Sequence, residues 1–231
     1  MATLPQVVSP DQWLESRLSL LAKEKELAKL QSEIRAQRKS LPCVEVTKSY
    51  AFTSPTGKVS LSDLFDGKKQ LIVYHFMFGP QSDAGCPHCS FLADDLKGVN
   101  PHLSHGRNTN LVFVSRAPID KIEAYKKRLG WDFKWYSVFE DDTFGKDYGV
   151  AFEEGAKEIT YNYEQMDASK MPKDLPGVSV FVKGEDGKVY HTYSGYGEFN
   201  HGTETLLDCT PLGRGDGEPE SWVRRNDEYG I

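Results

Sequence analysis

Two cysteines separated by two residues are the side chains of this sequence best suited to chemistry. Cys86 and Cys89 lie in the segment GPQSDAGCPHCSFLADD. A CxxC pair can form a redox-active disulfide, supply part of a metal site, or consist of two inert buried thiols. In the redox interpretation, Cys86 is the nucleophile and Cys89 resolves the mixed disulfide. Zinc knuckles share this spacing but need further ligands, and Cys43 and Cys209 are single and far apart. The pattern therefore favours redox chemistry and leaves a metal site open.

Two neighbouring side chains could tune the pair. His88 lies between the cysteines and would favour the thiolate form of Cys86. Asp83 precedes Cys86 by three residues and could accept a proton or cap a helix that begins at the motif. We expect Cys86, Cys89, His88 and Asp83 to form the catalytic group.

A histidine in the preceding apolar segment keeps a metal hypothesis open. His75 lies within VYHFMF, where a histidine is commonly a hydrogen-bonded core residue. It could also act as a base or substrate contact, or complete a metal site with Cys86 and Cys89, whose thiolates suit Cu or Zn. The alternative function is thus a Cu- or Zn-dependent enzyme or metal-binding protein. No nucleotide, serine-hydrolase or zincin motif occurs in the sequence, so no other cofactor is indicated.

Three arginines are candidates for substrate binding. Arg116 directly follows the apolar run NLVFVS, so it should project at the sheet edge where open α/β folds bind ligands. Arg224 and Arg225 lie in the tail and could join it in holding an anionic group. We therefore expect a small-molecule or thiol substrate.

The elements that would position these residues follow the order of a thioredoxin-like domain. The run QLIVYHFMF predicts a buried strand that ends just before the CxxC, and CSFLADDLKGVNPHL predicts a helix. A second strand (NLVFVSRA), a second helix (PIDKIEAYKKRLGW) and a β-hairpin (GVSVFVKGEDGKVYHTYSGYG) come later. The expected fold is α/β, with a central mixed sheet flanked by helices. At the start of a helix, unpaired N–H groups would stabilise the Cys86 thiolate.

A long amphipathic helix is predicted over residues 10–38. Trp13, Leu20, Leu27 and Ile34 recur every seven positions, and Ser9 is the expected N-cap. The helix could pack on its own domain or on a partner subunit. A third functional alternative is therefore a redox-silent interaction module that forms a homodimer through this helix.

Three regions follow from these patterns. We assign residues 1–40 to an N-terminal helical extension, 41–210 to the thioredoxin-like domain, and 211–231 to an irregular C-terminal tail packed on the domain. Residues 141–176 are polar and are expected to form a long connection or insertion inside the domain.

Composition limits the class of partner. The chain has 231 residues, 39% of them hydrophobic, and a formal net charge of −6. This charge gives no reason to expect nucleic acid or an anionic membrane as a partner. No apolar run approaches the roughly 18 residues needed to cross a bilayer, and no signal peptide is evident at the start. We expect a cytoplasmic protein.

Several long segments resemble one family. DGKKQLIVYHFMFGPQSDAGCPHCSFLADDL, VSRAPIDKIEAYKKRLGW, LPGVSVFVKGEDGKVYHTYSGYG and WVRRNDEY are similar to the thioredoxin-like family catalogued as domain of unknown function 899. The resemblance covers nearly the whole chain and implies the fold without an established activity. It extends to His75, Phe76, Met77, Phe78, Gly79, Asp83, Gly85, Cys86, Cys89, Ser115, Arg116, Trp131 and residues 222–229.

The sequence departs from this family, and from thioredoxin, at several points. His88 replaces a serine common in the family, and Asn226 replaces a histidine. YGEFNHG stands where the family has an aromatic-Ala-Arg-Gly turn after the hairpin. Where thioredoxins have a cis-proline facing the disulfide, this chain has Gly177. The segment GPQSDAG also separates the strand from the cysteines and could form a small-molecule pocket. These differences predict a small-molecule substrate in place of general protein disulfide exchange.

Overall fold

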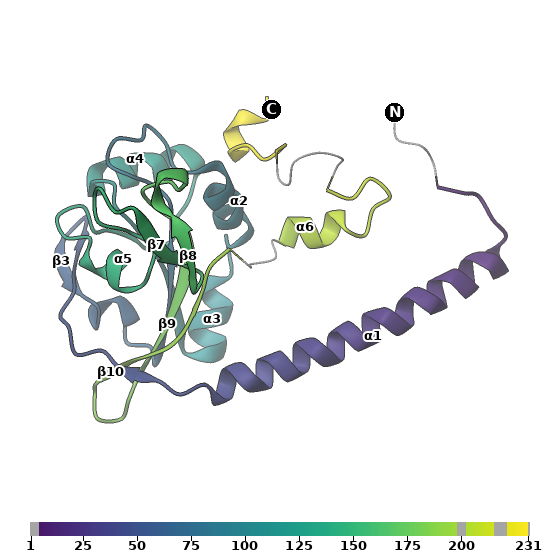
Figure 1. Ribbon diagram of the computed structural model, residues 1–231, viewed down its shortest axis with the longest axis horizontal. Coiled ribbons are helices and arrows are strands. Elements are labelled where there is room, and N and C mark those ends of the chain that lie inside the picture. Colours follow the sequence, from purple (N-terminus) through teal and green to yellow (C-terminus); the bar gives the residue numbers. More distant parts are fainter. Residues whose placement is uncertain (1–4, 198–201, 215–220, 231) are drawn as a thin grey trace.

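The computed structural model describes residues 5–197, 202–214 and 221–230, which are organised around an eight-stranded mixed sheet (Figure 1). The strand order across the sheet is β1-β10-β9-β4-β5-β6-β2-β3. The strands are β1 (Val44–Glu45), β2 (Ala51–Ser54), β3 (Gly57–Ser60), β4 (Gln70–His75), β5 (Thr109–Ser115), β6 (Trp135–Ser137), β9 (Gly177–Lys183) and β10 (Val189–Gly195).

Strand β4 is the centre of this sheet. It pairs in parallel with β5, which in turn pairs in parallel with β6. On its other side β4 is antiparallel to β9, and β9 forms a hairpin with β10. This combination of parallel βαβ crossovers and a closing hairpin is a thioredoxin-like α/β fold, as the sequence predicts.

Helices and turns cover the two faces of the sheet. Helices α2 (Pro87–Asp95), α3 (Asn100–Arg107) and α4 (Ile119–Leu129) lie on one face. The core below them is rich in aromatic side chains, including Phe76, Phe113 and Trp135. The other face is covered by a 3₁₀ turn (Asp63–Phe65) and by helix α5 (Thr143–Asp147), whose Phe144 is buried. The site thus lies on a sheet with a hydrophobic core on both faces.

The structure corrects several expected boundaries. The helix predicted over CSFLADDLKGVNPHL is divided into α2 and α3, because Gly98 between them adopts a left-handed φ of +87°. Strand β4 ends at His75, so the following Phe76–Phe78 belong to the loop. The long connection over residues 141–176 contains α5 and a separate hairpin of β7 (Glu158–Tyr161) and β8 (Glu164–Asp167).

The C-terminal region contains helix α6 (Gly202–Leu207) and a 3₁₀ turn (Asn226–Glu228). Residues 198–201, from the YGEFNHG segment that departs from the family pattern, lie outside the described residues.

The long N-terminal helix is confirmed as α1 (Pro10–Ser40). Ser9 caps it, and its side chain accepts a hydrogen bond from the Gln12 backbone N–H in a capping box. The helix buries none of its residues and projects away from the sheet (Figure 1). Trp13 is 60% exposed, so the expected packing on its own domain is wrong. The homodimer through this helix stays a prediction. Within the described residues, no helix combines the length and the apolar character needed to span a bilayer.

Deleting residues 1–40 should leave the domain folded. The deletion removes a cation–π contact of Arg38 with Tyr193 at 5.1 Å, which is worth about 0.5–1 kcal/mol at an exposed site. We expect the unfolding temperature to fall by no more than about 4 °C, measured by calorimetry. For comparison, Phe144→Ala should cost about 3–5 kcal/mol because Phe144 is buried. A deletion as damaging as Phe144→Ala would show that α1 packs on its own domain in solution.

Candidate active site

Cys86 lies where the chain turns from the central strand into helix α2. Its backbone N–H donates to the carbonyl of Met77 at 3.0 Å, which ties the motif to the segment just beyond β4. Cys86 is the N-cap residue of α2, and Pro87 occupies the first helical position. The thiol is therefore next to the positive end of the helix dipole, where an anion is stabilised. Asp83 is not the cap of this helix, because the chain enters the helix only at Cys86.

The two thiols differ in exposure and in acidity. Cys86 is half-buried, whereas Cys89 is 2% exposed. The pKa of Cys86 is lowered to about 5, mainly by a hydrogen bond from the Cys89 side chain. Hydrogen bonds from the Cys89 and His88 backbones and from the His88 side chain also lower this pKa, and burial opposes the shift. Burial and the Cys86 thiolate raise the pKa of Cys89 well above its usual range. The pair therefore consists of an accessible thiolate and a buried thiol that donates to it.

Polar groups also surround the buried thiol. The backbone N–H of Met77 donates to Cys89 Sγ at 3.5 Å, and the Tyr74 side chain forms a hydrogen bond with Cys89. Burial raises the pKa of Tyr74 well above its usual range, and burial together with the charge of a Cys89 thiolate raises the pKa of Tyr161 to about 12. Both tyrosines thus stay protonated, and Tyr74 can donate a hydrogen bond to Cys89 when it becomes an anion.

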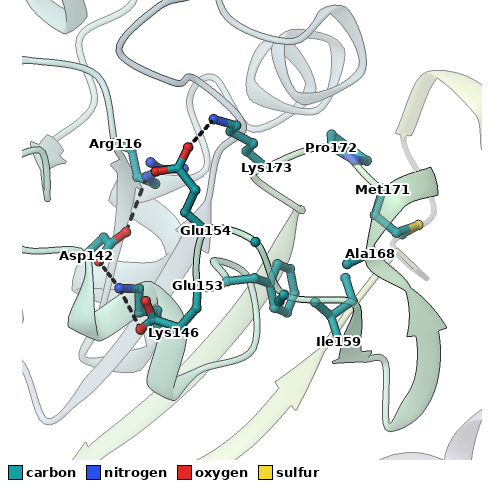
Figure 2. Close-up of a pocket in the computed structure, with 13 residues that line it drawn as sticks. Arg116, Asp142, Lys146, Glu153, Glu154, Ile159, Ala168, Met171, Pro172 and Lys173 are labelled. Atoms are coloured by element: carbon teal, nitrogen blue, oxygen red, sulfur yellow. Dashed lines mark ion pairs between the residues drawn. The ribbon is translucent and has the colours of Figure 1, made fainter.

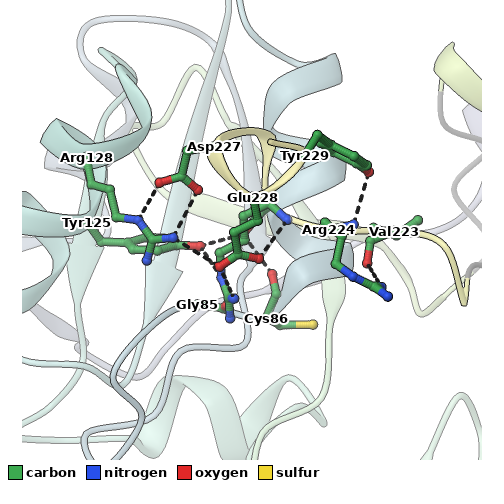
Figure 3. A network of polar contacts seen from close by, with 11 residues as sticks. Gly85, Cys86, Tyr125, Arg128, Val223, Arg224, Asp227, Glu228 and Tyr229 are labelled. Carbon is green, nitrogen blue, oxygen red and sulfur yellow. Dashed lines mark hydrogen bonds and ion pairs between the residues drawn. The ribbon is translucent and has the colours of Figure 1, made fainter. Parts of the chain in front are cut away.

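A polar network fixes the backbone around Cys86 (Figure 3). Ser90 Oγ donates to the Cys86 carbonyl at 2.8 Å and contacts the Tyr125 hydroxyl at 2.8 Å. Arg225 donates to the carbonyl of Gly85 through Nη2 at 2.6 Å and through Nε at 3.0 Å, and Nε also reaches Tyr125 at 3.0 Å. A Cβ on Gly85 would lie 2.6 Å from Phe76, so a glycine is required there. The backbone on both sides of Cys86 is thereby held.

The C-terminal segment that supplies Arg225 is itself anchored to α2 and α4. Arg128 on α4 forms a bidentate pair with Asp227 at 2.6 and 2.9 Å (Figure 3). Asn226, the residue that departs from the family pattern, donates to Asp94 on α2 at 2.7 Å. Trp131 donates to the same carboxylate oxygen at 2.7 Å. The asparagine therefore serves as a bridge between the tail and the active-site helix.

A pocket of about 500 Å³ opens beside Cys86. One wall is formed by the GPQSDAG segment, which the sequence singled out, and its carbonyls at Pro80 and Ser82 each accept a hydrogen bond from Lys121 at 2.9 Å. The other walls come from residues 172–174, Arg116 and Arg225. The accessible thiolate thus faces a cavity of the size that small-molecule sites commonly have.

Arg116 and Arg225 reach this pocket, but Arg224 does not line it. Arg116 Nη1 donates to Asp174 at 2.6 Å, and its Nε lies 3.7 Å from Asp142. Arg224 is exposed and donates to the carbonyls of Ser221 and Val223, so it holds its own segment (Figure 3). Of the three arginines predicted to bind substrate, two therefore line the pocket and one does not.

The two remaining candidates near the motif are exposed. Asp83 lies in the loop before α2, and His88 lies on the first turn of that helix, where it contributes hydrogen bonds to Cys86. A catalytic role for Asp83 stays a prediction.

His75 belongs to a different part of the molecule. Its Nε2 is 2.9 Å from Ser179 Oγ, and its ring stacks on Phe144 in the core on the other face of the sheet. Burial lowers the pKa of His75 to about 3. A chain of hydrogen bonds continues from Ser179 to Ser194 and His191. His75 is thus a neutral, hydrogen-bonded core residue that does not line the pocket beside Cys86.

The donor set predicted for Cu or Zn does not fit a metal ion here. The neighbouring side chain on β4, Tyr74, lies on the same face as Cys89, so strand alternation directs His75 to the opposite face. Across the described ranges, no three His, Cys, Asp or Glu side chains are grouped as metal ligands. The Cys86, Cys89 and His75 set is not assembled.

Sequence reasoning missed several residues of the site. Ser90, Tyr125, Lys121, Lys173 and Asp174 hold the loop, the motif or the pocket. Ser90 and Tyr125 lie on the helices predicted to flank the motif, so their helical positions were a usable signal. Lys173 and Asp174 come from the connection whose structure the sequence did not predict.

Comparisons with solved structures give distant similarities. Peroxiredoxin Q of Xanthomonas campestris is 12% identical, with 66% of this chain and 82% of that chain covered and a TM-score of 0.45. Peroxidoxin BcpB of Mycobacterium tuberculosis is 17% identical, with coverage of 70% and 88% and a TM-score of 0.46. A 2-Cys peroxiredoxin of Plasmodium vivax is 18% identical, with coverage of 68% and 82% and a TM-score of 0.39.

A comparison with curated proteins gave no match. The sequence does match one family over residues 2–229, which include the N-terminal helix, the Cys86 to Cys89 motif and the C-terminal segment with Arg225. The match thus covers every element of the candidate site. The chain belongs to the family described as bacterial protein of unknown function (DUF899).

Proposed function

We propose that this protein is a thiol-disulfide oxidoreductase that acts through Cys86 and Cys89 on a small molecule. The observation that carries the proposal is the asymmetry of the pair. Cys86 is accessible at a helix N-terminus with a pKa of about 5, whereas Cys89 is buried with a raised pKa. A thiolate is the attacking form of cysteine. The neighbouring thiol stays protonated, and therefore unreactive, until the mixed disulfide forms.

The reaction needs two steps. The Cys86 thiolate attacks one sulfur of a disulfide R–S–S–R, so that a Cys86–S–S–R bond forms and one R–S⁻ leaves. Cys89 then loses its proton and attacks Cys86 Sγ, which forms the Cys86–Cys89 disulfide and releases the second R–S⁻. Two electrons pass from the protein to the substrate, and a dithiol reductant restores the starting state.

The surroundings of Cys86 support a small molecule over a protein substrate. The GPQSDAG segment, residues 172–174 and Arg225 form walls on several sides of the thiol. Lys121 and Arg225 fix the first of these walls through backbone carbonyls. A walled site admits a compact disulfide more readily than an extended polypeptide, which needs an open groove.

The acidity of Cys86 should depend on the hydrogen bond from Cys89. We expect alkylation of Cys86 by iodoacetamide to be almost constant from pH 8 to pH 6 and to fall about tenfold per pH unit below about pH 5. Cys89→Ala removes the donor and should raise the pKa of Cys86 by one unit or more, about 1.4 kcal/mol, whereas Cys89→Ser keeps an O–H donor and should raise it less. Mass spectrometry of the Cys86 peptide separates it from the exposed Cys43 and Cys209. Equal shifts in the two variants would contradict this origin of the acidity.

The order of attack can be tested by trapping. Cys89→Ser, which lacks the resolving thiol, should accumulate one mixed disulfide at Cys86 when treated with hydroxyethyl disulfide. Cys86→Ser should accumulate none, since Cys89 is buried and protonated. In the native protein, redox titration should give a reversible two-electron transition at roughly −270 to −120 mV. A mixed disulfide at Cys89 in the Cys86→Ser protein would reverse the assigned roles.

Two adjacent arginines offer a matched test of the backbone clamp. Arg225→Gln removes the donors to Gly85. Arg224→Gln removes an exposed arginine whose side chain, among the described residues, donates to carbonyls of its own segment. We expect Arg225→Gln to raise the pKa of Cys86 and slow its alkylation at pH 6, because the motif is less well held. Arg224→Gln should match the native profile. If the two pH profiles coincide, Arg225 does not position the nucleophile.

A further inference from the structure

The pocket beside Cys86 has an unequal distribution of charge. Among the described residues, its lining includes three cations, Arg116, Lys173 and Arg225, and one carboxylate, Asp174. The nucleophile in the same pocket is an anion. Cations on the walls would offset the repulsion between that thiolate and a negatively charged substrate.

We infer that this pocket binds a carboxylate-bearing, low-molecular-weight disulfide, with Arg116 and Lys173 as the groups that hold the carboxylate. The inference rests on the proposed thiol-disulfide activity and adds the chemical class of its substrate. Arg225 is a positioning residue here, because its donors are used by Gly85, Tyr125 and Glu228.

Arg116 is oriented in advance. Its Nη1 donates to Asp174 at 2.6 Å and its Nε lies 3.7 Å from Asp142, so two carboxylates hold the guanidinium at two of its three nitrogens. The side chain is 26% exposed. Nη2 has no partner within the part of the chain that the structure describes. A planar guanidinium held in this way can present its remaining N–H groups to a carboxylate at little entropic cost.

Lys173 supplies a second, adaptable cation. Its Nζ lies 3.5 Å from Glu154, and both side chains are more than 80% exposed (Figure 2). An exposed pair of this kind contributes little to stability. Lys173 can therefore exchange Glu154 for a substrate carboxylate without a large loss of free energy.

A second pocket gives room for the rest of the substrate. It measures about 490 Å³ and shares Arg116, Pro172 and Lys173 with the pocket beside Cys86. Figure 2 shows charged side chains along one side of it, and Met171, Ala168 and Ile159 on another. The shared cations thus lie between the pocket beside Cys86 and a second cavity of similar size. This arrangement suits a disulfide whose carboxylate is set back from the sulfur that Cys86 attacks.

The inference is tested by the rate at which prereduced protein attacks two small disulfides. Dithiodipropionate carries two carboxylates, whereas hydroxyethyl disulfide is neutral. With the native protein, added salt should slow the first reaction and leave the second almost unchanged, because only the first is assisted by charge. Arg116→Gln should slow attack on dithiodipropionate about tenfold, equivalent to about 1.4 kcal/mol, and attack on hydroxyethyl disulfide less than about twofold. Lys173→Gln should act in the same direction with a smaller effect.

Two controls separate binding from general damage. Lys170→Gln removes the same charge from an exposed lysine that lines neither pocket, and it should leave both rates unchanged. Arg116→Lys keeps the charge without the planar fork, so it should restore part of the rate with dithiodipropionate. An equal loss with both disulfides in Arg116→Gln would assign Arg116 to the fold and overturn the inference.

Binding without reaction distinguishes this inference from the proposed function. Cys86→Ser cannot attack a disulfide, but its pocket should still bind dithiodipropionate in calorimetry, and adding Arg116→Gln should weaken that binding about tenfold. Binding without reaction in the native protein would support the anion site and refute the oxidoreductase. If both disulfides react and neither added salt nor Arg116→Gln changes their relative rates, the result would support the oxidoreductase and refute the anion site.

Discussion

The hydrogen bond from Cys89 to the Cys86 thiolate is the interaction on which the proposed chemistry depends. Since the pKa of Cys86 is lowered in the folded protein, the thiolate contributes to the stability of the reduced form above the unfolded pKa, and this contribution is lost as the pH falls through about 5. Formation of the disulfide removes both the thiolate and its hydrogen bond. Stabilisation of the reduced form raises the reduction potential of the pair, so the direction of net electron flow depends on the potential of the substrate disulfide.

Segments distant in sequence cooperate to hold this bond in place. The Gly85 carbonyl accepts from Arg225, which is 140 residues away along the chain, and Tyr125 joins Arg225 to Ser90 and hence to the Cys86 carbonyl. Phe76 and Tyr125 leave no space for a side chain at Gly85. Aromatic packing and the arginine thus act on the same peptide, directly before Cys86.

The sequence predicts the fold well because its strongest signals are local. Continuous apolar runs identify β4, β5 and β9, and the CxxC follows the first of them as expected. Successive side chains of a strand point to opposite faces of the sheet, so His75 faces away from Tyr74 and thus from Cys89. This alternation alone argues against the predicted metal site. The Arg225 clamp could not be predicted in this way, since residue types alone do not show which of two adjacent arginines turns inward. Likewise, the heptad-like spacing of α1 predicts the helix but not whether the domain covers it.

The connection between β6 and β9 shapes the pocket beside Cys86. Residues 172–174 lie against the pocket beside Cys86, and Asp174 also fixes Arg116, so one short segment both bounds the cavity and orients its cation. At the start of β9, a Cβ on Gly177 would meet Val150 and Tyr196 at 3.0 Å. That position is therefore filled by side chains from the connection and from the hairpin. In the proposed function, substrate recognition therefore falls to side chains around the pocket, which can discriminate by charge as well as by shape.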